Sequence, residues 1–410
     1  MRVSLRVVLL LALFTSLLSF AKFNYCAAED WKTPGQYIHA CYSDIPALYG
    51  ERELDSGRWS YSDAENSVEY PVVQGAIMWL TAKVIPTGVH NYFYGNVALL
   101  ALLFIFVAFI VYRIRPEFGY LLPLAPAAVA SLYINWDLWA IAAMMIAIYL
   151  FDREKILLSA ALLGISISTK FLPIFLLIPI ALIFFRQEKI QNFLKYLAVV
   201  IATFVAINAP VFLTTPDGWW RFYSLNLNRG SDWGSLWYAL SNLGLEFTHQ
   251  NYLSVLLLLV GTTALVIYLL QLRTPPTLAH TAVFIFIIVM GVSKVYSPQY
   301  VLWLTPLVII AMIDKRELAI FWFWQGCELL EHDRHHLVVG VEGVAVDVEL
   351  DLAEEAVAGV LAVADEVAVL DRGPRPLLPL GGAALDQHLA VDVDDVVGGG
   401  AVGGVEGERG

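Results

Sequence analysis

Carboxylates cluster in one polar stretch of this otherwise apolar chain, residues 22–71. Asp44 lies in Cys-Tyr-Ser-Asp-Ile, and Glu69 lies in Val-Glu-Tyr-Pro. A carboxylate among aromatic side chains beside a membrane is partly desolvated, which raises its pKa toward that of a general base. Asp44 and Glu69 are therefore both candidates for a general base. The alternative is that both carboxylates only form turns or cap helices.

Aromatic side chains accompany these carboxylates, and their flat faces suit a sugar ring. The candidates for acceptor or sugar binding are Tyr42, Tyr49, Tyr70, Asp137, Trp219 and Trp220. Asp137 could be a second acid near the site or the cap of the helix that follows it. Trp219 and Trp220 belong to a second polar stretch, residues 214–250, whose aromatic residues could instead form a belt at the membrane interface.

Polar side chains near the predicted outer ends of apolar segments could hold the phosphate of a lipid. The candidates for donor-phosphate binding are Arg229, Lys170, Lys294, Gln299 and Arg221. Lys170 and Lys294 each end an apolar run on the side where positive charge is uncommon. Arg229, in the polar turn Asn-Leu-Asn-Arg-Gly, is the preferred candidate. The alternative for each cation is that it only extends toward the lipid headgroups.

Membrane-embedded helices must position these residues. The chain has 410 residues, of which 59% are hydrophobic and 15% are charged. The apolar residues form continuous runs rather than the alternating pattern of a barrel, and helices satisfy their own backbone hydrogen bonds in lipid. The sequence therefore predicts an all-α, polytopic transmembrane helical bundle with about ten or eleven spans.

Basic residues predict the orientation of this bundle. Arg2 and Arg6 precede the first apolar run, so we expect a cytoplasmic N-terminus in the plasma membrane. Residues 22–71 and 214–250 then form two large extracytoplasmic loops. The first run could be a cleaved signal peptide, but no clear small-x-small site follows it, which favours a retained anchor. Residues 72–85 are too short to span the membrane, so we expect an interfacial or re-entrant helix there.

The sequence shows no metal-ligand spacing, although the carboxylates of the first outer loop could bind a divalent ion. It also shows no glycine-rich phosphate loop, so we do not expect a soluble nucleotide sugar or ATP as a direct substrate. Nothing in its charge pattern points to nucleic acid. Cys26 and Cys41 both lie in the first outer loop, where they could form a disulfide or remain as two thiols.

Residues 331–410 differ in composition from the rest of the chain. They hold 17 Asp and Glu against four Arg and no Lys, so the net charge of −12 comes from this tail. The tail uses only ten residue types, five with codons that begin with G and five that can be encoded by codons beginning with C. Out-of-frame translation of a G/C-rich gene yields this alphabet, and we expect residues 1–330 to form the transmembrane domain. A genuine disordered acidic tail is the alternative.

Five short motifs occur in the order and topology of a known enzyme family. They are CYSDIPALY (41–49), VEYPV (68–72), NWD (135–137), TKFLP (169–173) and SPQYVLWLTPL (297–307). In these motifs the chain resembles glycosyltransferase family 87, the polyprenyl-phosphate-mannose-dependent mannosyltransferases, which belong to the GT-C class of membrane glycosyltransferases. The resemblance implies a GT-C-like fold, a lipid-monophosphate sugar donor and an acidic base in the first outer loop. We assign that role to Asp44, with Glu69 as the second choice or as a partner of the acceptor. It also implies that no divalent cation is needed.

The function that we expect is transfer of a hexose, with mannose as first choice, from a polyprenyl-phosphate donor. The acceptor would be an envelope glycolipid or polysaccharide on the outer face of the membrane. A transporter or flippase of lipid-linked sugars is the alternative. Such a protein would share the aromatic loops and the cations, but it should prefer charges or broken helices in mid-membrane.

Overall fold

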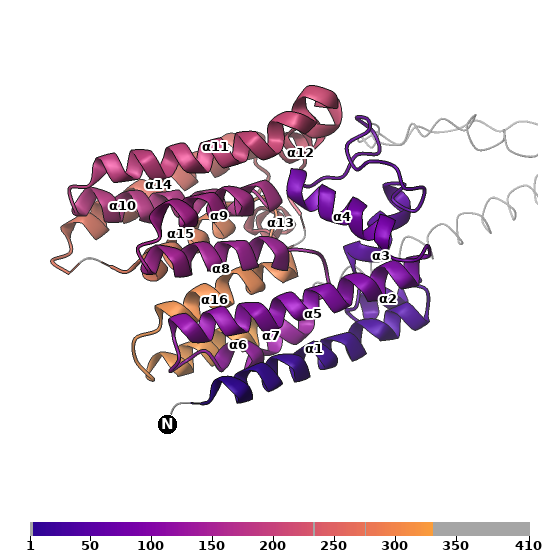
Figure 1. Cartoon of the computed structure of the whole chain (residues 1–410), viewed down its shortest axis with the longest axis horizontal. Coiled ribbons are helices and arrows are strands. Elements are labelled where there is room, and N and C mark those ends of the chain that lie inside the picture. Colours follow the sequence, from indigo (N-terminus) through magenta and orange to yellow (C-terminus); the bar gives the residue numbers. More distant parts are fainter. Residues whose placement is uncertain (1–2, 233, 275, 331–410) are drawn as a thin grey trace, which may run out of the picture. The chain divides into compact units, whose positions relative to one another are not determined.

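The computed structural model describes residues 3–330, except residues 233 and 275, and every regular element in this part is a helix (Figure 1). The predicted all-α class is therefore confirmed for the described residues. The predictions for residues 331–410 lie outside them.

Four helices are long and apolar enough to cross a membrane: α1 (Leu5–Ala28), α5 (Val89–Ile114), α11 (Ile190–Thr214) and α14 (Gln250–Gln271). The shorter apolar helices are α4 (Val72–Val84), α8 (Leu138–Asp152), α9 (Ile156–Thr169), η1 (Leu172–Leu176) with α10 (Leu177–Arg186), α15 (Leu278–Val292), and η2 (Pro298–Tyr300) with α16 (Val301–Ala311). The remaining named helices are α2 (Gly35–Ile38), α3 (Asp44–Glu51), α6 (Leu121–Leu124), α7 (Pro126–Ser131), α12 (Pro216–Asn228) and α13 (Leu236–Asn242). Residues 317–330 are also helical.

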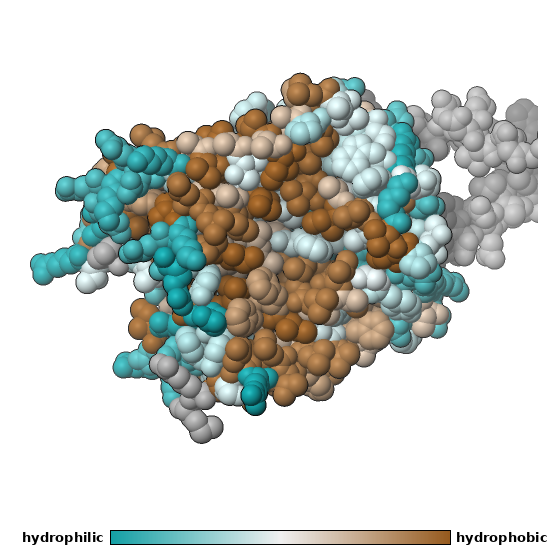
Figure 2. All heavy atoms as spheres, in the orientation of Figure 1, coloured by the Kyte–Doolittle hydropathy of each residue, from teal (hydrophilic) through white to brown (hydrophobic). Residues whose placement is uncertain are grey.

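The surface of this bundle is consistent with the predicted membrane protein. Figure 2 shows one face on which hydrophobic residues cover the middle and hydrophilic residues gather toward both ends. A helix needs about 20 apolar residues to cross the hydrocarbon core, and the four long helices meet this requirement. The larger count of ten or eleven spans stays a prediction, as does the orientation in the plasma membrane.

The helices pack side by side in the order α1, α5, α8, α9 and α11 (Figure 1). Behind this row, α16 contacts α5, α7 and α8, while α15 joins α16 to α14 and α10. The short helices α2, α3 and α12 lie toward one end of the long helices. We call this end the loop end.

Small residues allow close packing between α8, α9 and α11, as is common where helices associate in lipid. The hydroxyls of Ser159 and Ser166 on α9 donate to the carbonyl oxygens of Ala147 and Ala140 on α8, at 2.8 and 2.7 Å. A Cβ atom at Gly164 would lie 2.8 Å from Cβ of Thr203 on α11. A larger residue at position 164 would therefore push α9 and α11 apart.

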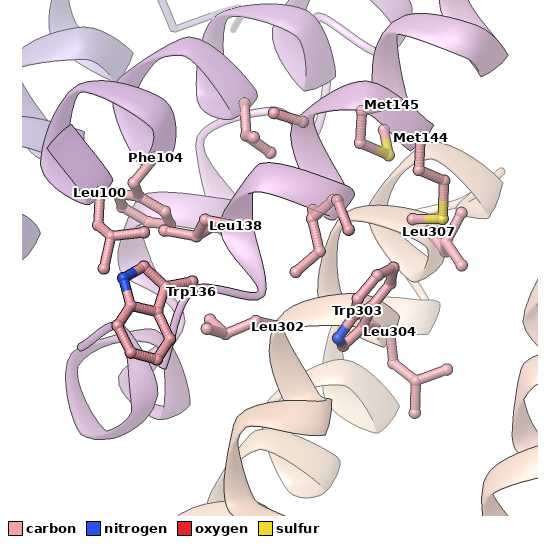
Figure 3. Close-up of a cluster of buried hydrophobic side chains, with 14 of the residues drawn as sticks. Leu100, Phe104, Trp136, Leu138, Met144, Met145, Leu302, Trp303, Leu304 and Leu307 are labelled. Carbon is pink, nitrogen blue, oxygen red and sulfur yellow. The ribbon is translucent and has the colours of Figure 1, made fainter. Parts of the chain in front are cut away.

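Two buried tryptophans fix the region where α8 begins. Trp136 and Trp303 are both fully buried in a hydrophobic cluster that also contains Leu302 (Figure 3). The Trp136 Nε1–H donates to Asn96 Oδ1 on α5 at 2.7 Å. Because a buried tryptophan needs a partner for its N–H, this bond holds the segment before α8 against α5.

Candidate functional site

The first loop, predicted for residues 22–71, is shorter than the sequence indicated, because α1 continues to Ala28. Its last turns bury Phe23, Cys26 and Ala27 in the bundle, so residues 22–28 belong to the helix. Cys26 forms a disulfide with Cys41, which returns the chain to the end of α1. The disulfide thus anchors the segment that leads into Asp44.

Asp44 is the first residue of α3, and the segment before α8 holds it in place. The preceding residue, Ser43, accepts a hydrogen bond from the Ile45 N–H at 3.2 Å and so caps the helix. The Ser43 hydroxyl also donates to the Tyr133 carbonyl oxygen at 2.7 Å, and the Asp44 N–H donates to the Ile134 carbonyl oxygen at 2.7 Å. These bonds fix the backbone of Asp44 relative to the bundle.

A cavity of about 640 Å³ lies at the loop end, beside Asp44. Seven of the predicted site residues line it: Asp44, Glu69, Tyr42, Tyr70, Lys170, Arg229 and Gln299. They come from residues 22–71 and 214–250, the two predicted loops, and from the ends of two apolar segments. The structure therefore brings together residues whose positions in the sequence differ by up to about 250.

Asp44 is a half-buried residue, and its carboxylate receives hydrogen bonds from two tyrosines. The Tyr70 hydroxyl donates to Asp44 Oδ2 at 3.0 Å, and Tyr42 donates a second bond. Burial raises the pKa of Asp44 above its ordinary value, while these two bonds and the charge of Lys170 oppose the rise. The charge of Asp44 and burial raise the pKa of Tyr42, so Tyr42 remains a proton donor. Asp44 is thus a carboxylate with increased basicity.

Lys170 follows α9 directly and forms an ion pair with Asp137, with Nζ 2.7 Å from Oδ1. Asp137 is 2% exposed, and its other oxygen accepts from Trp303 Nε1 at 2.8 Å. The Lys170 ammonium also lies over the Tyr70 ring, 4.8 Å from its centroid. Asp137 does not line the cavity itself. Asp137 instead holds Lys170, which lines the cavity.

Glu69 is bound by two arginines. Arg52 donates to it from Nε at 3.1 Å and also from NH2, and Arg221 NH2 lies 3.3 Å from Oε1. Because two cations compensate its charge, Glu69 is less suited than Asp44 to remove a proton. Arg221 joins α12 to the first loop and does not line the cavity.

Arg229 and Lys294 have different roles in the structure. Arg229 lines the cavity and pairs with Asp232, NH2 to Oδ2 at 2.7 Å. The Lys294 ammonium donates to the carbonyl oxygens of Asn226 and Arg229, at 3.2 and 2.7 Å. Lys294 thus binds the carboxyl end of α12, where a positive charge is favourable, and does not line the cavity.

Three predicted sugar-binding aromatics also lie outside the cavity lining. Tyr49 stacks on Tyr92, with ring centroids 4.5 Å apart. Trp219 donates from Nε1 to Asn208 Oδ1 on α11 at 3.0 Å, and the neighbouring Trp220 is 50% exposed. Tyr49 and Trp219 therefore have packing roles in this structure.

The cavity also contains residues that the sequence analysis did not select. Tyr37 stacks on Tyr42 at 5.5 Å between centroids, and both rings belong to residues that line the cavity. Asn135 and Tyr300 line it as well. Asn135 belongs to the motif NWD, in which Asp137 was the predicted site residue. Tyr300 belongs to the motif SPQY, in which Gln299 was the predicted site residue.

The described residues hold no group of three or more His, Cys, Asp or Glu side chains that could bind a metal ion. The expectation that no cation is needed stays a prediction. No family model matches the sequence, and no curated protein matches it. The resemblance to glycosyltransferase family 87 therefore also stays a prediction.

Proposed function

We propose that the protein is a membrane glycosyltransferase that transfers a hexose, with mannose as first choice, from a polyprenyl-phosphate donor to an envelope glycolipid or polysaccharide. The observation that carries this proposal is one cavity lined by both a carboxylate of raised pKa, Asp44, and two cations, Lys170 and Arg229. A base and an anion site in the same cavity are the two groups that transfer from a lipid phosphate requires.

Asp44 is the base in this proposal. An acceptor hydroxyl gives its proton to the carboxylate as its oxygen forms a bond to the anomeric carbon. The bond between that carbon and the phosphate oxygen breaks, and its electron pair leaves with the lipid phosphate. Attack from the side opposite the phosphate inverts the configuration, so a β-linked donor gives an α-linked product. The hydrogen bonds from Tyr42 and Tyr70 orient the carboxylate for this step.

Lys170 and Arg229 are the candidates for stabilising the departing phosphate. An ammonium carries three N–H donors, and Asp137 accepts one from Lys170 at 2.7 Å, so further donors can turn to a ligand. Arg229 is paired with Asp232. A phosphate would therefore share the guanidinium with Asp232 or displace it, which makes Lys170 the first choice.

The test uses membranes that contain the full chain, radiolabelled polyprenyl-phosphate mannose and an endogenous acceptor fraction. We expect Asp44→Asn to reduce transfer by about 100-fold or more, because general bases contribute roughly 10²–10⁴-fold. The matched control is Asp55→Asn, since Asp55 is an exposed carboxylate of the same loop. Full transfer by a normally inserted Asp44→Asn variant would contradict the proposal. Movement of the labelled lipid across the membrane without transfer would favour a flippase.

A further inference from the structure

Two amide side chains in the cavity wall have polar atoms without a partner. Asn135 is 3% exposed and Gln299 is 6% exposed, and both line the cavity. Among residues 3–330, apart from 233 and 275, neither Asn135 Nδ2 nor Gln299 Oε1 has a hydrogen-bond partner. Buried polar atoms are nearly always satisfied in folded proteins, so two exceptions in one wall require an explanation.

The two amides are held on connected segments. The Asn135 Oδ1 atom accepts from the Asp137 N–H at 2.9 Å, which identifies Nδ2 as the unpaired donor. The Ser131 hydroxyl donates to the Pro298 carbonyl oxygen at 3.2 Å, so the segment before α8 is joined to the residue that precedes Gln299. The wall is therefore built by neighbouring segments, and the unpaired atoms are unlike groups: one donor and one acceptor.

A donor and an acceptor in one wall match the hydroxyl groups of a sugar, because each hydroxyl both donates and accepts. The terminal torsions of Asn and Gln are soft, so each amide can turn toward a ligand without moving the backbone. The same cavity contains the stacked rings of Tyr37 and Tyr42, which offer flat apolar faces to a sugar ring. Water or a phosphate would not require an aromatic surface.

We propose that Asn135 and Gln299 are specificity-determining residues that form hydrogen bonds with two hydroxyl groups of the hexose ring. This inference rests on the proposed function, because it assigns the sugar of the donor to the cavity that holds Asp44. A site built to bind a hydroxyl rejects an analogue that lacks it, since the amide is then left unpaired. The wall formed by these two residues selects the hexose.

Binding measurements on the purified full chain test the proposal. The probes are a short-chain isoprenyl mannosyl phosphate and its monodeoxy analogues, each lacking one hydroxyl, with affinity followed by tryptophan fluorescence. We expect the wild type to prefer the parent compound over two of the analogues by about tenfold or more. Asn135→Ala and Gln299→Ala should each lose the preference against one analogue and keep the others.

Asn226→Ala is the matched control, because Asn226 also lines the cavity but its Nδ2 already donates to the Phe222 carbonyl oxygen at 2.7 Å. This variant should keep the wild-type preferences. The proposal is overturned if neither Asn135→Ala nor Gln299→Ala changes the preferences, if either weakens all probes equally, or if the wild type binds no probe.

The same preparations separate this inference from the proposed function. If mannose is transferred but both variants keep the wild-type preferences among the probes, the glycosyltransferase proposal stands and the proposed role of Asn135 and Gln299 is rejected. If the parent compound is bound selectively and the two substitutions alter this selectivity, but no mannose is transferred, the role of Asn135 and Gln299 stands and the proposed enzyme activity is rejected.

Discussion

Replacing Tyr70 by phenylalanine removes one hydroxyl from the candidate site and keeps the ring beneath Lys170. The lost group is the donor that lies 3.0 Å from Asp44 Oδ2. A hydrogen bond to a charged group contributes about 1.5–3 kcal/mol, and one pKa unit corresponds to about 1.4 kcal/mol. Loss of this bond should therefore raise the pKa of Asp44 by about 1–2 units, because the bond favours the charged carboxylate.

The assay is the pH dependence of kcat/KM for transfer of mannose. If the reaction needs the ionised Asp44, the acidic limb of the profile moves to higher pH by the same 1–2 units or so. Below that limb, Tyr70→Phe should be about 10–100 times slower than the wild type, and well above it the two should converge. The Asp44 pKa also depends on burial, Tyr42, Lys170 and Asp137, none of which this substitution removes.

Tyr61→Phe is the control for this experiment. Tyr61 is 1% exposed and lies in the same loop, but its hydroxyl donates to the carbonyl oxygens of Tyr70 and Pro71, at 2.9 and 2.7 Å. This variant should lower stability and leave the acidic limb in place. An unchanged limb in Tyr70→Phe, or an equal shift in both variants, would refute the assignment of Asp44 as the base.

Two further predictions concern stability, measured by thermal unfolding in detergent. Lys170→Met should destabilise the protein by roughly 3–5 kcal/mol, because it leaves the buried Asp137 without its cation. Adding Asp137→Asn should recover most of this stability. If stability is not recovered, the ion pair is not the cause of the loss. Reduction of the Cys26–Cys41 disulfide, which closes a separation of 15 residues, should cost about 3 kcal/mol. A Cys26→Ser, Cys41→Ser variant should show the same loss and become insensitive to reductant.

The sequence predicted the helical class and several residues that line the cavity, because these depend on local composition. Continuous apolar runs specify helices in lipid, and the polar stretch around Asp44 is visible as a departure from them. Lys170 was a candidate because it ends an apolar run on the predicted outer side, and it lines the cavity. Its role at a phosphate stays a prediction.

Partners could not be predicted from local composition, since ion pairs join residues distant in sequence. Arg221 was expected at a phosphate, but it binds Glu69 in the first loop. Lys294 was expected there too, but the carbonyl oxygens at the end of α12 hold its ammonium. The sequence did not predict Asn135 as a site residue, because its unpaired donor can be recognised only when all contacts of the amide are known.

The hydrogen bond from Ser43 to Tyr133 has a consequence for the biosynthesis of the protein. Its two ends are 90 residues apart, and at roughly 5–20 residues per second the ribosome needs about 5–20 s to make that interval. The first loop thus emerges before the segment that positions Asp44 exists, whereas Cys26 and Cys41 are available to each other at once. Early oxidation would keep the unfinished loop close to the end of α1 until the later helices are inserted. A variant with Cys26→Ser and Cys41→Ser should therefore yield less of the mature protein, even where synthesis and insertion proceed normally.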